Sequence, residues 1–377
     1  KHRMLHQTSY SEQLTFFQKF RSLDFLLILC TLVLGCIGTI AMYSSESGEL
    51  LYYTNSHIIR FVVFFSMMIF LSFVRIKFWH SLGYFFYFIV TLLLIYASLY
   101  GITASGSQRW INLYFVNLQP SELMKIAIIV CFAKYYHRMQ INNVNNLKNL
   151  IIPIIILVIP VVLVLGQPDL GTSILIASSG LIVIWLSGVN IKYFVYSTLT
   201  LIISAPFIIS FLEPYQKLRI LSFFNPDRDP LGAGYQILQS KIAVGSGGLL
   251  GKGYLKGTQS YLEYLPEKHT DFIFTLYSEE FGFLGSSILL ILYFVMLFRI
   301  TRIGQQAKSY FAKIFCFGFS SALFIYIIVN MSMVLGMLPI VGSPLPIMSY
   351  GGSALLSTMI GFSIVMSCKI YSKETIS

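Results

Sequence analysis

The sequence predicts an all-α polytopic membrane protein with ten transmembrane helices and a large extracytoplasmic loop between spans seven and eight. The first observation is composition: 56% of the 377 residues are hydrophobic and only 11% are charged, whereas soluble domains carry about 25% charged residues. The second is a series of apolar runs, each close to the ~20 residues that cross the hydrocarbon core of a bilayer. The third is the uneven distribution of basic residues among the connections, which sets the orientation.

The apolar runs divide the chain into one membrane domain, residues 23–368, between a cytoplasmic N-terminal segment, 1–22, and a cytoplasmic tail, 369–377. A polar, basic stretch precedes the first run, which continues as a full span, so we expect no cleavable signal peptide. The long extracytoplasmic loop covers residues 213–271. The ten expected spans are 23–43, 58–74, 78–99, 120–137, 151–166, 172–188, 193–212, 272–298, 314–337 and 351–368.

The charges in the connections predict which side faces the cytoplasm. Sixteen of the 26 Lys and Arg residues, but only three of the 15 acids, fall at the two termini and in alternate connections. The positive-inside rule makes this face cytoplasmic, with both termini inside. The net charge of +11 therefore reflects membrane topology, and we expect no nucleic-acid partner.

The chemistry is expected on the opposite, outer face. Its connections are a polar loop at 100–119, a turn at 167–172, the long loop at 213–271 and a proline-rich segment at 338–352. The cytoplasmic connections are short and basic, whereas long polar loops tend to be functional or disordered. Seven aromatic residues in the long loop favour an ordered, interfacial segment.

The five cysteines do not indicate a metal site or a disulfide framework. All of them lie in or at the ends of apolar runs, and the sequence contains no CxxC motif or Cys/His cluster.

The stretch from 261 to 285 carries the most informative acids. Five ionisable residues stand directly before an apolar run: Glu263, Glu267, Lys268, His269 and Asp271. One interpretation of Asp271 is a helix N-cap, worth about 1 kcal/mol. The other is a catalytic carboxylate that takes a proton from a sugar hydroxyl, because titratable groups crowded at one rim shift one another's pKa values.

Glu279 and Glu280 follow inside the apolar run itself. Ionisable groups at membrane depth are costly and are usually paired, hydrated or functional. We expect these two to pair with a neighbouring helix or to line a hydrated cavity without reacting.

A second cluster stands at the outer start of the fourth span and contains Arg109, Glu122 and Lys125. Glu122 and Lys125 are three residues apart, so they share a helix face and could simply neutralise each other. Alternatively, Lys125 and Arg109 bind anionic phosphates. Pro120 suits the first turn of this helix, and Asp169, taken alone, is typical of turn chemistry.

Two further features concern the backbone. The glycine-rich run 245–253 has the wrong spacing for a nucleotide-binding loop. We expect its glycines to let the backbone approach a ligand or to let a flexible loop close on it.

Asn330 and the prolines at 339, 344 and 346 predict a helix that breaks at the outer face. Such non-helical backbone is tolerated only where protein buries it or a cavity wets it.

Several motifs in order resemble the SEDS proteins, the RodA/FtsW family of cell-wall polymerases, over about residues 23–368. They are SQRWINL with QPSELMK, QPDLGT, FFNPDRDPLGAGYQILQSKIAVGSGGLLGKG, GTQSYLEYLPEKHTDFIF with SEEFGFLG, and MLPIVGSPLPIMSYGGS. The PLP in the last motif is most similar to RodA, the elongation branch, rather than to the division branch.

The resemblance implies a multi-pass glycosyltransferase of the bacterial cytoplasmic membrane that polymerises lipid II into peptidoglycan strands on the outer face. It implies that Asp271 is the essential aspartate and that Glu263, Glu122 and Lys125 lie at positions the family needs. It also implies a class B penicillin-binding protein, a transpeptidase, as partner.

The mechanism expected is general-base catalysis by Asp271, with inversion to a β-1,4 link and release of undecaprenyl diphosphate. Arg109 and Lys125 are the expected partners of that diphosphate, together with a divalent cation, Mg²⁺ or Mn²⁺, that no sequence motif specifies. His269 and Lys268 complete the candidate site. Two alternatives stay open: a transporter that flips lipid II, and a scaffold that only recruits the transpeptidase.

Overall fold

The structure is a computed structural model of the chain. It describes residues 15–104, 107–113, 117–139, 143–211, 217, 221–223, 232–258 and 267–376. Glu263, one of the predicted site residues, lies outside these ranges.

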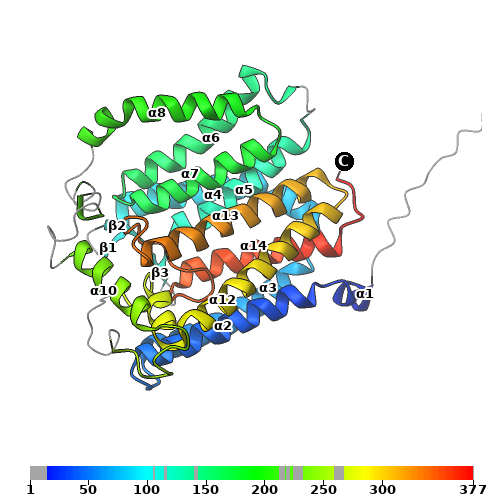
Figure 1. The fold of residues 1–377 in the computed structure, drawn as a ribbon. Coiled ribbons are helices and arrows are strands. Elements are labelled where there is room, and N and C mark those ends of the chain that lie inside the picture. Colours follow the sequence, from blue (N-terminus) through cyan, green and yellow to red (C-terminus); the bar gives the residue numbers. More distant parts are fainter. Residues whose placement is uncertain are drawn as a thin grey trace, which may run out of the picture.

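Long helices packed side by side form the body of the molecule (Figure 1). The helix bounds in the described residues are α1 Phe16–Arg21, α2 Phe25–Ser45, α3 Tyr52–Ser72, α4 Ile76–Tyr100, α5 Pro120–His137, α6 Leu147–Leu165, α7 Leu170–Leu186, α8 Ile191–Phe211, α10 Ala233–Ser246, α12 Ile273–Gln306, α13 Tyr310–Val334 and α14 Gly352–Ile370.

Each range predicted as a span falls on one of these helices. By length and composition, seven helices of the described chain could cross a membrane: α2, α3, α4, α6, α12, α13 and α14. α7 and the first part of α8 are apolar but shorter. The structure is therefore consistent with a polytopic membrane protein.

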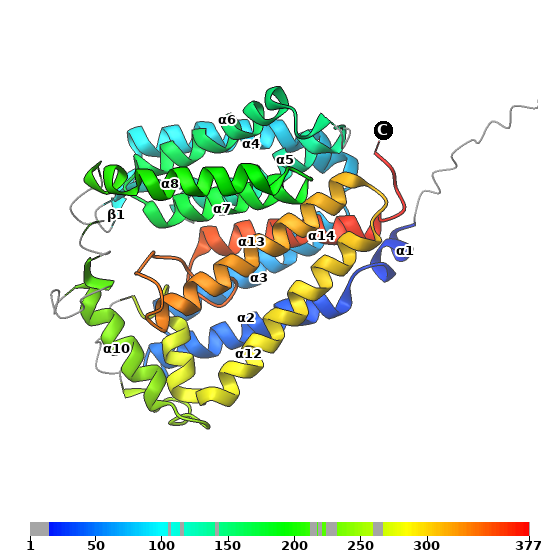
Figure 2. The ribbon, with the colours of Figure 1, turned by 45° about the horizontal axis from the view of Figure 1, so that its top comes forward.

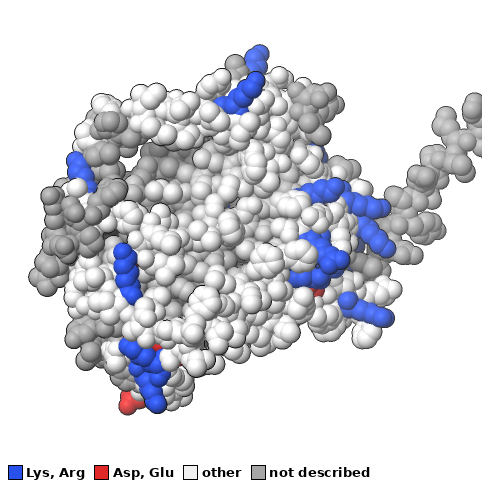
Figure 3. All heavy atoms as spheres, in the orientation of Figure 1, with Lys and Arg blue, Asp and Glu red and all other residues white. Residues whose placement is uncertain are grey.

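Burial separates a central helix from the peripheral ones. Nearly every residue of α5 is buried, including Glu122 and Lys125. The outer faces of α3, α4 and α6 instead expose large apolar side chains, for example Phe70, Phe88 and Ile154. In the surface view, Lys and Arg gather toward the ends of the bundle, and the flank between them is almost free of charge (Figure 3). This is the charge distribution of a protein whose sides face lipid.

The polar loop at 100–119 is not simply a loop, so the all-α prediction needs a correction. It forms an antiparallel sheet of three short strands, β1 Ile102–Ala104, β2 Ser107–Asn112 and β3 Asn117–Leu118, in the order β1-β2-β3. Trp110 pairs with Ile102. The segment is too short and polar to be recognised by period-2 patterning alone.

The first residues of α12 form a separate segment, because Gly282 has non-helical backbone angles (φ 64°) that break the helix. Figure 2 shows this short segment turned away from the long remainder of α12 and lying beside α10. Glu279 and Glu280 therefore stand at the end of a short helix, whereas the sequence placed them inside a continuous span.

Both acids have hydrogen-bond partners, as the structural interpretation predicted. Glu280 binds a neighbouring helix, α2, whereas Glu279 binds the segment that follows α10. Glu279 accepts hydrogen bonds from the Lys252 ammonium (2.7 Å) and from the backbone and side chain of Thr258. Glu280 accepts from the hydroxyl of Ser44 on α2.

The glycines of the turn after α10 let its backbone approach α12, whereas their approach to a ligand stays a prediction. The amide of Lys252 donates to the carbonyl of Glu279, and the amides of Phe283 and Leu284 donate to carbonyls of the turn. A Cβ on Gly251 would lie 2.0 Å from the carbonyl oxygen of Glu280. The turn thus supplies partners for backbone groups that the break at Gly282 releases.

This close approach gives a stability prediction. Gly251 and Gly248 both have positive φ, so alanine at either position costs about 1 kcal/mol of backbone strain. Only Gly251→Ala must also displace the α12 backbone, which adds on the order of 1–3 kcal/mol. Gly248→Ala, with nothing within 4 Å of its Cβ, is the matched control. Thermal unfolding in detergent should show the larger loss for Gly251→Ala. Equal losses would contradict the packing described here.

Candidate functional site

The site is built around the segment 338–351, which runs between α13 and α14 without helical structure. Leu345, Ile347 and Met348 in this segment are at most 2% exposed. The predicted helix break is thus present, and its backbone is buried in protein, as membrane-embedded irregular backbone requires.

Asn330 on α13 joins this segment to the start of α12. Its amide nitrogen donates to the carbonyl oxygen of Ser343 (2.7 Å) and to that of Asp271 (2.9 Å). Asn330 is fully buried, so its hydrogen bond to Ser343 forms away from competing water. One side chain therefore sets the spacing between the segment and Asp271.

Asp271 lies two residues before α12. The N-cap of α12 is Phe272, and no side chain caps this helix end, so the interpretation of Asp271 as an N-cap is wrong. The Asp271 side chain is partly exposed. Its Oδ2 lies 3.6 Å from the position a Cβ would take on Gly342, so the carboxylate faces a residue without a side chain.

His269 and Lys268 precede Asp271 in the same turn and are partly exposed. The Nδ1 of His269 lies 2.7 Å from the hydroxyl of Ser45, and its ring stacks on Tyr53 at 4.1 Å. Its carbonyl accepts from the amide of Tyr350. His269 thus ties the turn that carries Asp271 to α2, α3 and the 338–351 segment.

Glu46 binds the start of α3, next to His269. It follows α2 and accepts hydrogen bonds from the amides of Tyr53 and Thr54 and from the Thr54 hydroxyl (2.5 to 2.9 Å). Burial raises the pKa of the Glu46 carboxyl, but these hydrogen bonds and nearby His269 outweigh it and hold the pKa below the ordinary 4.5. The contribution of Glu46 to stability is therefore present above that ordinary value and lost as pH falls through the lowered pKa.

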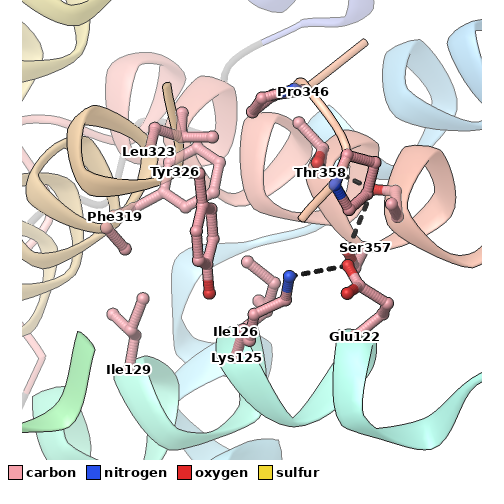
Figure 4. A pocket seen from close by; sticks show the side chains of 13 residues that line it. Glu122, Lys125, Ile126, Ile129, Phe319, Leu323, Tyr326, Pro346, Ser357 and Thr358 are labelled. Carbon is pink, nitrogen blue, oxygen red and sulfur yellow. Dashed lines mark hydrogen bonds and ion pairs between the residues drawn. The ribbon is translucent and has the colours of Figure 1, made fainter. Parts of the chain in front are cut away.

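Glu122 and Lys125 form a buried ion pair of 2.8 Å on α5, as the structural interpretation predicted. The Lys125 ammonium also lies 4.1 Å from the centre of the Tyr326 ring on α13. Figure 4 shows the pair at the floor of a small cavity that Tyr326, Pro346 and Thr358 also line. The ammonium points into the space between these residues.

Arg109, on β2, is likewise paired. Its guanidinium lies 2.7 Å from the Asp169 carboxylate, which also caps α7 through the amide of Thr172 (3.1 Å). Gln119 donates to the same carboxylate (3.2 Å). Asp169 thus has the predicted turn role and a charge partner that the sequence analysis did not assign to it.

The 338–351 segment brings these groups together. Gly342 faces Asp271, and Pro344 lines the cavity of Lys125. Two residues of backbone span at most about 7 Å. Asp271 and the cavity of the Glu122–Lys125 pair therefore lie beside neighbouring residues of one segment. Arg109 is linked through Asp169 to Gln119, the residue before α5. Among the predicted site residues, Glu263 cannot be placed.

A family model described as a cell cycle protein, FtsW/RodA/SpoVE, matches residues 24–374. The chain belongs to the FtsW/RodA/SpoVE family. It is a glycosyltransferase, in agreement with the activity named for its curated relatives.

Two members of the FtsW/RodA/SpoVE family illustrate the similarity. The peptidoglycan glycosyltransferase MrdB of Escherichia coli K12 is 46% identical over 288 residues, 76% of this chain and 77% of MrdB. The stage V sporulation protein E of Bacillus subtilis is 33% identical and covers 93% of this chain and 98% of its own.

Solved structures have the same fold as this chain. A chain from a study titled "Structural coordination of polymerization and crosslinking by a peptidoglycan synthase complex" aligns with a TM-score of 0.80 and 27% identity, covering 93% of this chain and 98% of the other. The Thermus thermophilus rod shape determining protein RodA has the same fold, with a TM-score of 0.70 and 22% identity over 93% of this chain and 98% of RodA.

The described part of this family member contains no cluster of three or more His, Cys, Asp or Glu side chains that could hold a metal ion. A divalent cation near Asp271 fits only if substrate phosphates supply most of its ligands, which is common for Mg²⁺.

Sequence reasoning missed Arg60 on α3. It stands alone in the apolar run at 58–74, and its guanidinium lies 4.8 Å from the centre of the Tyr350 ring. Its signal was simply a single arginine within a predicted span, which by default indicates function.

The Arg109–Asp169 pair predicts a stability difference. Asp169 is 4% exposed, so Asp169→Asn removes a charge partner and leaves a half-buried guanidinium uncompensated, at a cost of about 2–3 kcal/mol. Glu374→Gln breaks the looser, more exposed 3.7 Å pair with Lys77 and should cost less than about 1 kcal/mol. Chemical unfolding in detergent measures both losses. A loss for Asp169→Asn no greater than for Glu374→Gln would refute the structural role of the pair.

Proposed function

We propose that this glycosyltransferase polymerises lipid II into β-1,4-linked glycan strands on the outer face of the bacterial cytoplasmic membrane during cell elongation. The observation that carries the proposal is the setting of Asp271. Its carboxylate is partly exposed and faces a glycine, while its backbone is fixed by Asn330. A general base needs this combination of access and fixed position.

The proposed reaction begins at the 4-hydroxyl of the acceptor's N-acetylglucosamine. Asp271 takes the hydroxyl proton, and the oxygen attacks C1 of the donor's N-acetylmuramic acid with inversion. The bond between C1 and the diphosphate oxygen breaks, and its electron pair leaves with undecaprenyl diphosphate. Gly342 leaves space beside the carboxylate in which a sugar hydroxyl could approach.

The leaving diphosphate is proposed to face the second cluster. Lys125 gives one N–H to Glu122 and has further donors toward the cavity. Arg109 keeps a buried Nε–H that no described oxygen accepts. Both cations are nevertheless paired with a carboxylate, so each cluster is close to neutral and would stabilise a diphosphate less than a free cation would. Glu263, His269 and Lys268 stay supporting residues in this proposal.

The membrane arrangement we propose has ten spans, α2 to α8 and α12 to α14, with both termini in the cytoplasm and the loop 213–271 outside. The basic residues near α1 and the C-terminus support this orientation. The resemblance to a chain of a peptidoglycan synthase complex supports a transpeptidase of the class B penicillin-binding protein type as partner.

Asp271→Asn tests the proposal directly. Purified variant protein should lose about 10²- to 10⁴-fold of the rate of lipid II polymerisation, because positioned proton transfer contributes on that order. Its thermal stability should be retained, since Asn keeps the size of the side chain and the carbonyl that Asn330 binds. Glu267→Gln, an exposed acid in the same turn, is the matched control and should stay within about threefold of wild type.

Vesicle assays separate the alternatives. A flippase would move labelled lipid II across the bilayer without making polymer, and a scaffold would support its transpeptidase normally with Asp271→Asn. Normal strand synthesis by that variant would rule out the proposed base.

A further inference from the structure

The short helix α1 exposes most of its apolar surface. It has no buried residue, and Phe16, Phe17 and Phe20 are 72%, 78% and 45% exposed. A helix of six residues is not stable in water by itself, and adjacent exposed apolar side chains mark an interaction site. The phenylalanine face of α1 therefore needs a partner that covers it.

The order of residues in α1 separates the phenylalanines from the charges. Successive helical residues are rotated by about 100°, so Phe16, Phe17 and Phe20 fall within about 100° of one another. Lys19 and Arg21 follow on the two flanks of this apolar face. An apolar face between basic flanks is typical of a helix that lies in the plane of a membrane surface.

Contacts with the rest of the protein fix how α1 is turned. The ring centroids of Phe16 and Phe73, the residue after α3, are 5.3 Å apart. The Lys19 ammonium lies 5.7 Å from the centre of the Tyr371 ring, just after α14. Phe17 and Arg21 are on the exposed side. Figure 2 shows α1 at the same end of the bundle as the C-terminus.

The surroundings of α1 carry an excess of positive charge. Basic side chains gather at this end of the bundle (Figure 3), and Arg75 and Arg302 are exposed there. The acids described at this end, Asp24 and Glu374, are already in ion pairs with basic residues, at 2.5 and 3.7 Å. The field around α1 therefore attracts anionic head groups.

We propose that α1 lies in the cytoplasmic surface of the membrane, with Phe17 and Phe20 among the acyl chains and Arg21 at the phosphates of anionic phospholipids. Guanidinium groups bind phosphate through paired N–H donors. A lipid surface fits better than a protein partner, because α1 directly precedes α2, a helix long and apolar enough to cross a membrane. The choice of the cytoplasmic leaflet rests on the orientation proposed above, whereas the lipid contact does not.

Amide hydrogen exchange tests this contact. Full-length protein is placed in nanodiscs of phosphatidylcholine, with or without phosphatidylglycerol. Mass spectrometry follows the amides of Lys19 and Ser22, which donate to carbonyls of Thr15 and Gln18. Phosphatidylglycerol should slow their exchange about tenfold, because each basic residue near an anionic surface strengthens binding by about fivefold. Nanodiscs expose both leaflets, so the result does not depend on the orientation of the protein.

Three variants separate the charged and the apolar contacts. Arg21→Gln should reduce the slowing by phosphatidylglycerol to about twofold. Phe17→Ser should speed exchange about tenfold in both lipid compositions, because an inserted ring is lost. Arg302→Gln, which removes an exposed arginine of α12 at the same end, is the matched control and should behave like wild type.

Equal exchange of the wild-type protein with and without phosphatidylglycerol would overturn the anionic-lipid contact. So would an effect of Arg21→Gln no larger than that of Arg302→Gln. Wild-type exchange by Phe17→Ser would overturn the insertion of α1 among the acyl chains.

Discussion

The site depends on two hydrogen bonds that the side-chain amide of Asn330 donates. These two hydrogen bonds hold the carbonyl of Asp271 and that of Ser343 at a fixed distance, and Asn330 and Ser343 are buried. An unsatisfied backbone carbonyl in such a place costs several kcal/mol. These hydrogen bonds therefore tie together the start of α12, the last turns of α13 and the segment 338–351.

The same need for backbone partners explains the contact between α12 and the turn after α10. The break at Gly282 frees backbone groups of α12, and the turn after α10 supplies their partners through glycines that allow close contact. Glu279 holds that turn by hydrogen bonds from Lys252 and Thr258, and Glu280 accepts one from Ser44 on α2. These buried acids stabilise a bend near the site, while the Asp271 side chain is partly exposed.

Charge pairing distinguishes the cations. Arg109 and Lys125 each have a carboxylate at 2.7 to 2.8 Å. These pairs anchor β2 to α7 and shape the cavity on α5. Arg60 instead lies over the ring of Tyr350, 4.8 Å from its centre.

The positions of the helices and part of the candidate site were predictable from the sequence. Apolar runs and loop charges located the helices, because hydrophobic periodicity and the cost of buried charge act locally. Glu122 with Lys125 was predictable from their helical spacing. The partners of Asp169, the small sheet at 102–118 and the kink at Gly282 were not, because each depends on residues far apart in the chain. Arg60 was visible in the sequence, but its contact with Tyr350 was not, because the two residues are far apart in the chain.

The most direct test of the account is the pH dependence of the single-turnover rate of glycan bond formation. For the wild-type enzyme, the rate should fall as pH drops through one acidic ionisation, because a protonated Asp271 cannot accept the hydroxyl proton. The small residual rate of the Asp271→Asn protein should show no such ionisation. If the same acidic limb persists in that variant, the base is another group and the role assigned to Asp271 is wrong.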